Sequence, residues 1–144
     1  MDYCDKFFYH MARHNMVVVR ELLQENPELT NMRRSGSTAL HLAARLGNLE
    51  LARLLLGRGA QLEAQTETTG STPLKLAVFF AHIDMVKLLL EEGADIDNPG
   101  GTARTPLTLA LDATTPMFRE MGTPGSDLDY ARIANILRSK LFRS

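Results

Sequence analysis

The stretch GSTALHLAARLGNLELARLLLGRGAQLE, residues 36–63, returns thirty-four residues later as GSTPLKLAVFFAHIDMVKLLLEEGADID, residues 70–97. The segment TPLTLAL at 105–111 opens a third copy, and NMVVVRELLQENPEL at 15–29 has the second half of the same unit. A repeat of this length is typical of a solenoid, in which each unit buries its apolar face only against its neighbours.

Each copy predicts two short helices joined by a turn. A threonine opens the first helix and is a good N-cap, and in two copies a proline follows at the first helical position. A glycine after the second helix, Gly59 or Gly93, is expected to end it in the left-handed conformation. One alanine per copy gives the first helix a small side chain at the position where it packs closely on its neighbour. These threonines and alanines are Thr38, Thr72, Thr105, Ala43, Ala77 and Ala110.

The motifs T-[AP]-L-[HKT]-L-A, ELARLLLGRGAQLE and DMVKLLLEEGADID make the chain resemble the ankyrin repeat family. The match is fullest over 34–98 and less complete over 1–33 and 99–144. The resemblance implies an all-α solenoid of four helix–turn–helix repeats with projecting β-turn fingers and modified caps at both ends. We expect one ankyrin repeat domain over 1–144, with repeats at about 1–33, 34–67, 68–100 and 101–144.

The two end repeats depart from the pattern. In the first, we expect Asp2 to start the helix and Phe7 and Phe8 to take core positions. The last repeat has an insertion at about 113–128, between its two helices. Thr115–Pro116 is typical of a helix start, and Gly122 is typical of a helix end. Ser126 with Asp129 predicts a capping box for the final helix. We expect Met117, Phe118 and Met121 to share one side of this helical turn, as a lid over the end of the stack or as a partner-binding element.

Composition narrows the class of protein. Of the 144 residues, 44% are hydrophobic and 23% charged, and the formal net charge is −1. This near-neutral charge argues against nucleic acid or an anionic membrane as the main partner. The single cysteine, Cys4, allows no intramolecular disulfide and fits a reducing compartment. The sequence shows neither a secretory signal nor an apolar run that could span a bilayer, so we expect a cytoplasmic location.

The resemblance implies binding of a protein partner through the concave face of the first helices and through the finger tips. The concave positions that a stack leaves least constrained follow the pair of an alanine and the next residue in each first helix. They are Arg13, Arg45, Leu46, Phe79, Phe80 and Asp112, with Ala12 and Ala113 completing the pairs. The finger-tip candidates are Met32, Arg33, Arg34, Gln65, Thr66, Glu67, Thr68, Asn98, Thr102 and Arg104.

The phenylalanine pair at 79–80 stands out because aromatic residues are only 6% of the chain. Aromatic side chains are efficient interface anchors. One interpretation is that at least one ring anchors a partner. The alternative is that one ring packs inward, against Leu46 or against Phe118 and Met117. Ala81, which follows the pair, replaces the glycine that ends the first helix of the preceding copy and is expected to cost about 1 kcal/mol there.

The histidines favour structural roles. The resemblance implies that His41 bonds between repeats. His82 lies at an exposed helix start, and no function is assigned to it. His10 and His14 have a metal-capable spacing on one helix, but Cys4 is off their stripe and no carboxylate joins them, so we expect no metal.

The chain has no G-x-S-x-G motif, no phosphate-binding glycine loop and no recognisable Cys–His pairing. We therefore expect neither an enzyme nor a cofactor. The favoured function is a protein-binding module, monomeric on its own, that acts as an adaptor or as an inhibitor of the immunity type. The alternative is a structural or oligomerising unit that uses the apolar insertion. A metal-binding or enzymatic protein is the least favoured class.

Overall fold

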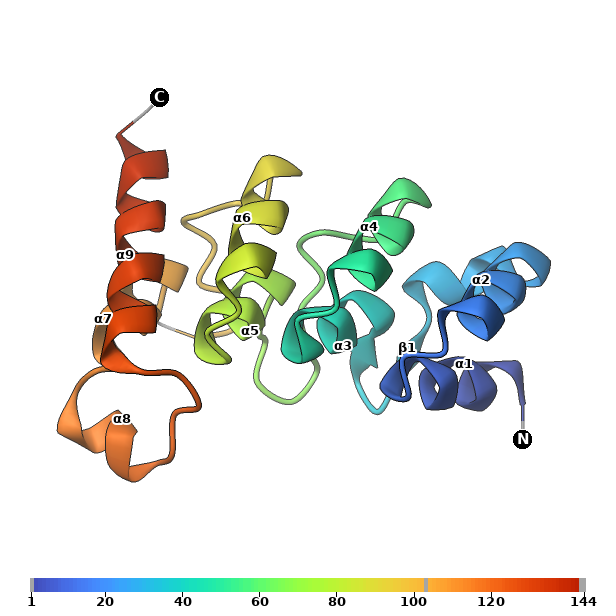
Figure 1. The fold of residues 1–144 in the computed structure, drawn as a ribbon, viewed down its shortest axis with the longest axis horizontal. Helices are drawn as coiled ribbons and strands as arrows, with labels where there is room; N and C mark the ends of the chain where they lie inside the picture. Colours follow the sequence, from blue (N-terminus) through green and yellow to red (C-terminus); the bar gives the residue numbers. More distant parts are fainter. Residues whose placement is uncertain (1, 103, 143–144) are drawn as a thin grey trace.

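A computed structural model describes residues 2–102 and 104–142. Pairs of antiparallel helices follow one another in a row from the N-terminal to the C-terminal end (Figure 1). The first helices of the four pairs are α1 (Tyr3–Ala12), α3 (Ala39–Leu46), α5 (Pro73–Phe79) and α7 (Pro106–Asp112). The second helices are α2 (Met16–Glu25), α4 (Leu49–Gly57), α6 (Ile83–Glu91) and α9 (Asp127–Leu141). The predicted all-α solenoid of four repeats is confirmed.

The helix starts follow the predicted capping chemistry. In α3, α5 and α7 a threonine hydroxyl accepts a hydrogen bond from the backbone N–H three residues later, which satisfies one of the donors that a helix start leaves unpaired. At α1 the Asp2 carboxylate does the same, and at α9 Ser126 and Asp129 form the predicted capping box. The three threonines are Thr38, Thr72 and Thr105.

Small side chains let the first helices approach one another, and larger ones fill the space behind them. The three predicted alanines are at most 1% exposed, and Phe7 is fully buried in the same continuous core. The predicted core position of Phe8 is also confirmed, since its ring is 6% exposed. Because each helix pair buries this apolar surface only against its neighbours, the core runs along the whole row.

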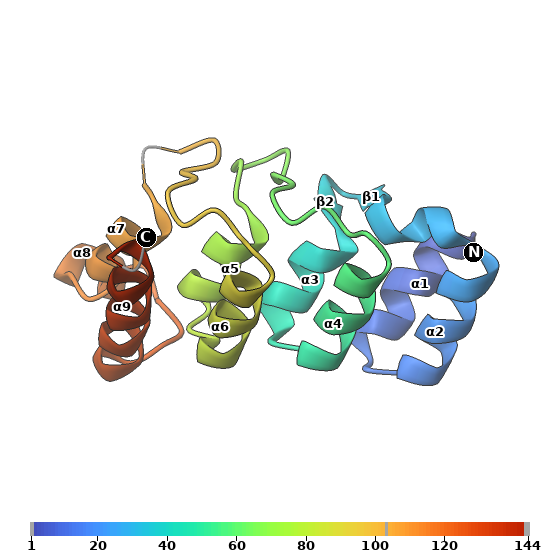
Figure 2. The same cartoon turned by 90° about the horizontal axis from the view of Figure 1, so that it is seen from above.

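Fingers project along one edge of the row, where Figure 2 shows them side by side. The first follows the short helix η1 (Pro27–Asn31) and is a two-stranded hairpin of β1 (Arg33–Arg34) and β2 (Ser37–Thr38), with Arg33 opposite Thr38. Neighbouring fingers bond through their backbones. The Glu67 N–H donates to the Gly36 carbonyl at 3.0 Å, and the Gly101 N–H donates to the Gly70 carbonyl at 2.8 Å.

The insertion in the last repeat forms helix α8 (Pro116–Glu120), which begins after Thr115 and is followed by Gly122 in the left-handed conformation, as predicted. The expectation that its three large apolar residues share one side is wrong. Phe118 packs into the core at 9% exposure, whereas Met117 and Met121 are 66% and 70% exposed. In a helix these two methionines are four residues apart on one face, and Phe118 lies a third of a turn away from Met117.

The insertion also crosses the end of α5. Ala81 is left-handed there, with a φ of 58°, as Gly47 is after α3 with a φ of 70°. Gly125 lies against it so closely that a Cβ added at Gly125 would stand 2.4 Å from the Ala81 Cβ. The phenolic O–H of Tyr130, the fully buried tyrosine of α9, donates a hydrogen bond to the Phe79 carbonyl at 2.5 Å. The insertion and α9 therefore hold the end of α5 in place.

Candidate functional site

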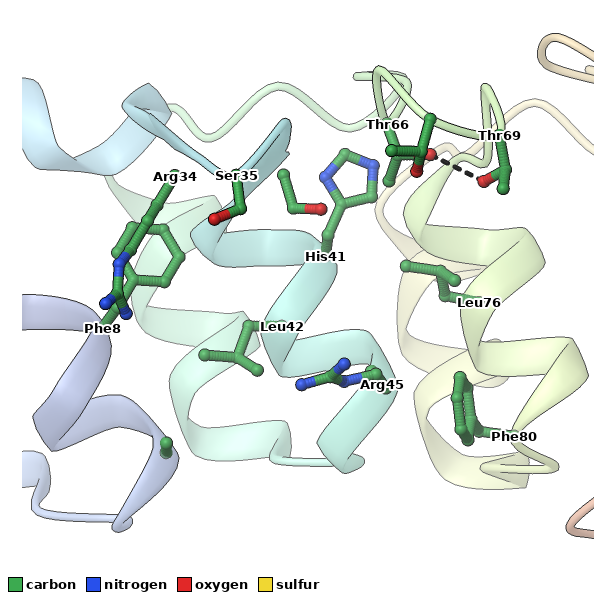
Figure 3. Close-up of a pocket in the computed structure, with 13 residues that line it drawn as sticks. Phe8, Arg34, Ser35, His41, Leu42, Arg45, Thr66, Thr69, Leu76 and Phe80 are labelled. Carbon is green, nitrogen blue, oxygen red and sulfur yellow. Dashed lines mark hydrogen bonds between the residues drawn. The ribbon is translucent and has the colours of Figure 1, made fainter. Parts of the chain in front are cut away.

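A groove of about 520 Å³ runs between the first helices of the first three repeats and the first two fingers (Figure 3). Its floor is apolar and comes from α1, α3 and α5, together with Phe80 directly after α5. Helix periodicity explains why these side chains share one face, since residues three or four apart lie above one another. The apolar residues that line the groove are Phe8, Ala12, Leu42, Leu76 and Phe80.

The finger side of the groove carries hydroxyl groups. Several of them bond within the fingers, because the Thr66 and Thr69 hydroxyls lie 2.9 Å apart and the Thr66 hydroxyl accepts from the Ser71 N–H at 3.0 Å. Thr66 is only 8% exposed, which corrects the expectation of an exposed threonine at this tip. The hydroxyl residues that line the groove are Ser35, Ser37, Thr66, Thr68 and Thr69.

Two arginines and a histidine complete the lining. The Arg34 guanidinium pairs with Asp5 at 3.2 Å and lies 5.8 Å from the centre of the Phe8 ring. Arg45 is exposed, and in Figure 3 its guanidinium lies between Leu42 and the side of the groove that carries Phe80. The groove therefore combines an apolar floor with exposed cationic groups.

His41 is buried and electrically neutral. The backbone N–H of Thr38 donates to its Nδ1 at 3.1 Å, so the ring proton is on Nε2, which donates to the Ser71 carbonyl of the next repeat at 2.9 Å. Burial is the main cause that lowers the pKa of this imidazole. The expected bond between repeats is present.

The buried imidazole predicts a pH-dependent stability. In the unfolded chain the pKa of His41 is about 6.5, and in the folded chain it is lower. The unfolded chain therefore binds a proton at His41 more readily than the folded chain does. Its contribution to the free energy of unfolding is complete above about pH 6.5 and is lost as the pH falls toward the folded-state pKa. We expect a lower melting temperature at about pH 5.5 than at about pH 7.5. His41→Gln, which keeps an N–H donor but does not titrate, should show a smaller difference, and an equal difference in both proteins would contradict the assignment.

The two phenylalanines have different roles. Phe80 lines the groove, whereas Phe79 packs against the core and ends α5, where its carbonyl is held by Tyr130. Their rings meet edge to face with centres 5.1 Å apart. Both rings are half-buried. Phe79 therefore packs inward, whereas Phe80 takes the open groove position. The contacts expected for the inward ring, with Leu46 or with Phe118 and Met117, stay a prediction.

A second hollow of about 400 Å³ continues the groove along α1, since both are lined by Phe8, Ala12 and Arg34. Tyr9 and Arg13 extend the lining there, and the Arg13 guanidinium lies 4.5 Å from the centre of the Tyr9 ring. The predicted concave positions Arg13, Arg45 and Phe80 are therefore brought into one continuous surface.

The remaining concave candidates lie elsewhere. Leu46 is half-buried at the end of α3. Asp112 pairs with Arg104 at 2.8 Å, and the Arg104 guanidinium lies 4.9 Å from the centre of the Phe118 ring. Ala113 is fully buried, so its expected place on an unconstrained concave surface is wrong. In the last repeat these positions anchor the insertion.

Several finger-tip candidates hold the fingers together. Arg33 donates from its guanidinium to the carbonyls of Gly36 and Gln65, at 3.0 and 2.8 Å. Asn98 donates to the Glu63 carboxylate at 2.8 Å. Met32 is half-buried against the core. Three other candidates, Gln65, Glu67 and Thr68, are exposed.

Lys75 is a buried lysine that links two repeats, and sequence reasoning did not single it out. Its side chain stands where the preceding repeat has His41 and is 4% exposed. Its ammonium donates to the Pro99 carbonyl at 2.8 Å and to the Thr102 hydroxyl. Burial, and then the charge of Arg104, lower its pKa. Thr102, a predicted finger-tip residue, is therefore engaged within the protein.

The other histidines contact neighbouring elements. His82, to which no function was assigned, donates from Nε2 to the Arg45 carbonyl at 2.7 Å and thus ties its repeat to the end of α3. His10 and His14 each lie near an asparagine amide, Asn15 at 3.4 Å and Asn48 at 3.2 Å. Among residues 2–102 and 104–142, no three side chains of the metal-ligating types gather into a cluster.

Comparison with known families decides the identity of the fold. The sequence pattern of ankyrin repeats, in three copies, matches residues 8–100. The chain belongs to the ankyrin repeat family. Ankyrin repeats are generally protein–protein interaction modules, and the family is typically non-enzymatic. A search of curated proteins finds no match to this ankyrin repeat chain. In the part of the chain that the structure describes, every helix is too short or too polar to cross a membrane.

The matched residues include the whole groove and leave out the fourth helix pair with its insertion. The sequence predicted Arg34, Arg45, Thr66, Thr68 and Phe80 as binding residues that prove to line this surface. It did not predict the lining residues Phe8, Leu42 and Leu76. A signal was present, because Leu42 precedes Arg45 by three residues and Leu76 precedes Phe80 by four, which puts each pair on one helix face.

Proposed function

We propose that this ankyrin repeat protein binds another protein through the groove between α1, α3, α5 and the fingers. The observation that supports the proposal is the apolar floor of the open groove, which consists of the half-buried Leu42, Leu76 and Phe80 and the more deeply buried Phe8. Apolar hollows bordered by polar groups are typical of interaction sites. Bound to its partner in this way, the protein acts as an adaptor or as an inhibitor of the immunity type.

Phe80 is the residue expected to contribute most to binding. Its ring is only half-buried, and aromatic residues are enriched among the side chains that dominate binding energy. We expect Phe80→Ala to weaken partner binding about tenfold, which corresponds to about 1.4 kcal/mol, with little change in melting temperature. Affinity capture from native lysate, with the retained proteins quantified, identifies the partner, and titration of that partner with both proteins gives the ratio of affinities.

The matched control is Val17→Ala. Val17 is 68% exposed on α2, away from the groove lining, and its substitution also removes apolar carbon atoms, although fewer than Phe80→Ala does. A partner that is retained equally by the wild type, Phe80→Ala and Val17→Ala would contradict binding through the groove. A large loss of stability in Phe80→Ala would instead identify this ring as part of the core.

The second candidate function is self-association through the insertion. The observation that favours it is the exposure of Met117, Met121 and Leu128, which are 66%, 70% and 60% exposed near the C-terminal end of the row. Light scattering distinguishes the two functions. A dimer that Met117→Lys with Met121→Lys converts to a monomer would support self-association, and a wild-type monomer would oppose it.

A further inference from the structure

The groove and its continuation along α1 carry an excess of positive charge. Three arginines line them, Arg13, Arg34 and Arg45, against a single carboxylate, Asp5. The chain as a whole has a formal net charge of −1, so this excess is local. His41 adds no charge near neutral pH, because its pKa is lowered and its ring is held in the neutral form.

The three arginines differ in whether the guanidinium group already has a partner within the protein. Arg34 pairs with Asp5, and the Arg13 guanidinium stacks on Tyr9. Among the described residues, no carboxylate lies within salt-bridge distance of Arg45, and its side chain is exposed. A guanidinium can bind a carboxylate with two parallel hydrogen bonds, and it is weakly hydrated enough to do so against an apolar surface.

The cationic and apolar groups alternate along the groove. In Figure 3, Arg34 lies beside Phe8 at one end, Leu42 and Arg45 follow in the middle, and Leu76 and Phe80 lie at the other end. A ligand that lies along this surface meets positive charge between apolar patches. Opposite charge on the ligand would both speed its encounter and fix its register.

We propose that the groove binds an extended acidic segment of the partner protein, with a carboxylate on Arg45 and an apolar side chain on the floor formed by Leu42, Leu76 and Phe80. This inference rests on the proposed function, since it names the chemistry of the partner at the same site. A segment rich in lysine or arginine is disfavoured there, because like charges across an interface cost binding energy.

Selection of displayed random peptides on the wild-type protein tests the proposal without knowledge of the natural partner. We expect the selected peptides to be enriched in aspartate and glutamate next to leucine, isoleucine or an aromatic residue. Synthetic copies of these peptides, measured by fluorescence anisotropy, should bind more weakly as salt increases, because exposed charge pairs are screened.

Charge reversal then assigns the contact. Arg45→Glu should weaken the selected peptides at least about tenfold, since it replaces a charge-assisted hydrogen bond by a repulsion. The control is Arg53→Glu, an exposed arginine on α4 of the same repeat, which should leave the affinity nearly unchanged. Melting curves of both variants confirm that the fold is retained, as expected for exposed side chains.

The outcomes separate the two proposals. If the selected peptides are uncharged or basic and bind Phe80→Ala more weakly than the wild type, the proposal of an acidic segment is overturned, whereas binding through the groove is supported. Peptides that bind equally to wild type, Phe80→Ala and Arg45→Glu, or a selection that yields no binders, would overturn both. A single-stranded oligonucleotide that binds the wild type and displaces the selected peptides, with the same dependence on Arg45, would overturn the choice of a protein partner.

Discussion

Tyr130→Ala is expected to lower the free energy of unfolding by about 3–5 kcal/mol, the range for removal of a large buried aromatic side chain. Tyr130 is fully buried in α9, and its ring lies beneath Gly125 of the insertion. Its hydroxyl donates to the Phe79 carbonyl at 2.5 Å and accepts from the Gly125 N–H at 3.2 Å. One side chain thus joins the last helix, the insertion and the end of α5. Chemical denaturation measures the loss.

Two further variants divide this loss into its parts. Tyr130→Phe keeps the ring and removes only the hydroxyl, so it should cost about 1–2 kcal/mol, because the Phe79 carbonyl and the Gly125 N–H lose a partner. Tyr3→Ala is the control, since Tyr3 is 56% exposed on α1, and it should change the stability by no more than about 0.5 kcal/mol. A loss below about 1 kcal/mol in Tyr130→Ala would mean that the last repeat is held by other contacts.

Sequence alone was enough for the features that depend on near neighbours along the chain. The threonine caps, the left-handed glycines and the Ser126–Asp129 capping box all form within a few residues, so local chemistry determines them. The repeat then determines how the helix pairs pack, because each first helix, with its small side chain at the contact, must lie against the next one.

The placement of individual side chains at the site required the structure. The register of α8 against the core decides that Phe118 is buried and Met117 is exposed, and helical spacing within five residues cannot supply that register. Likewise His82 bonds to a carbonyl 37 residues away, and Lys75 bonds to a finger 24 residues away. Leu42 is half-buried in the groove, on the face of α3 that also carries Arg45, and only the contacts between repeats show that this face stays open.

The fingers owe their arrangement to the same kind of distant contact. His41 reaches the Ser71 carbonyl of the second finger, and Lys75 reaches the third finger through Pro99 and Thr102. Two different side chains at equivalent positions of successive repeats thus perform the same task. The finger side of the groove is therefore held in a fixed position above its floor, which lowers the ordering cost of binding.

Gly70→Ala is expected to cost about 2–4 kcal/mol and to separate the second and third fingers. Gly70 has a φ of 67°, in the left-handed region, where a Cβ costs roughly 1–2 kcal/mol. A Cβ there would also stand 2.4 Å from the Gly101 Cα and 2.5 Å from its nitrogen, both backbone atoms that cannot turn aside. The fingers would have to separate, and the hydrogen bond from the Gly101 N–H to the Gly70 carbonyl would be strained or lost.

Gly93→Ala isolates the backbone part of this cost. Gly93 is also left-handed, with a φ of 97°, but an added Cβ meets no heavy atom within 4 Å. Its loss of stability should therefore be about 1–2 kcal/mol, the cost of the backbone alone, and the excess in Gly70→Ala measures the collision. Faster amide hydrogen exchange at Gly101 only in Gly70→Ala would locate the opening between the fingers. If the two variants lose the same free energy of unfolding and the amide exchange rate at Gly101 does not change, the fingers are not in contact in solution.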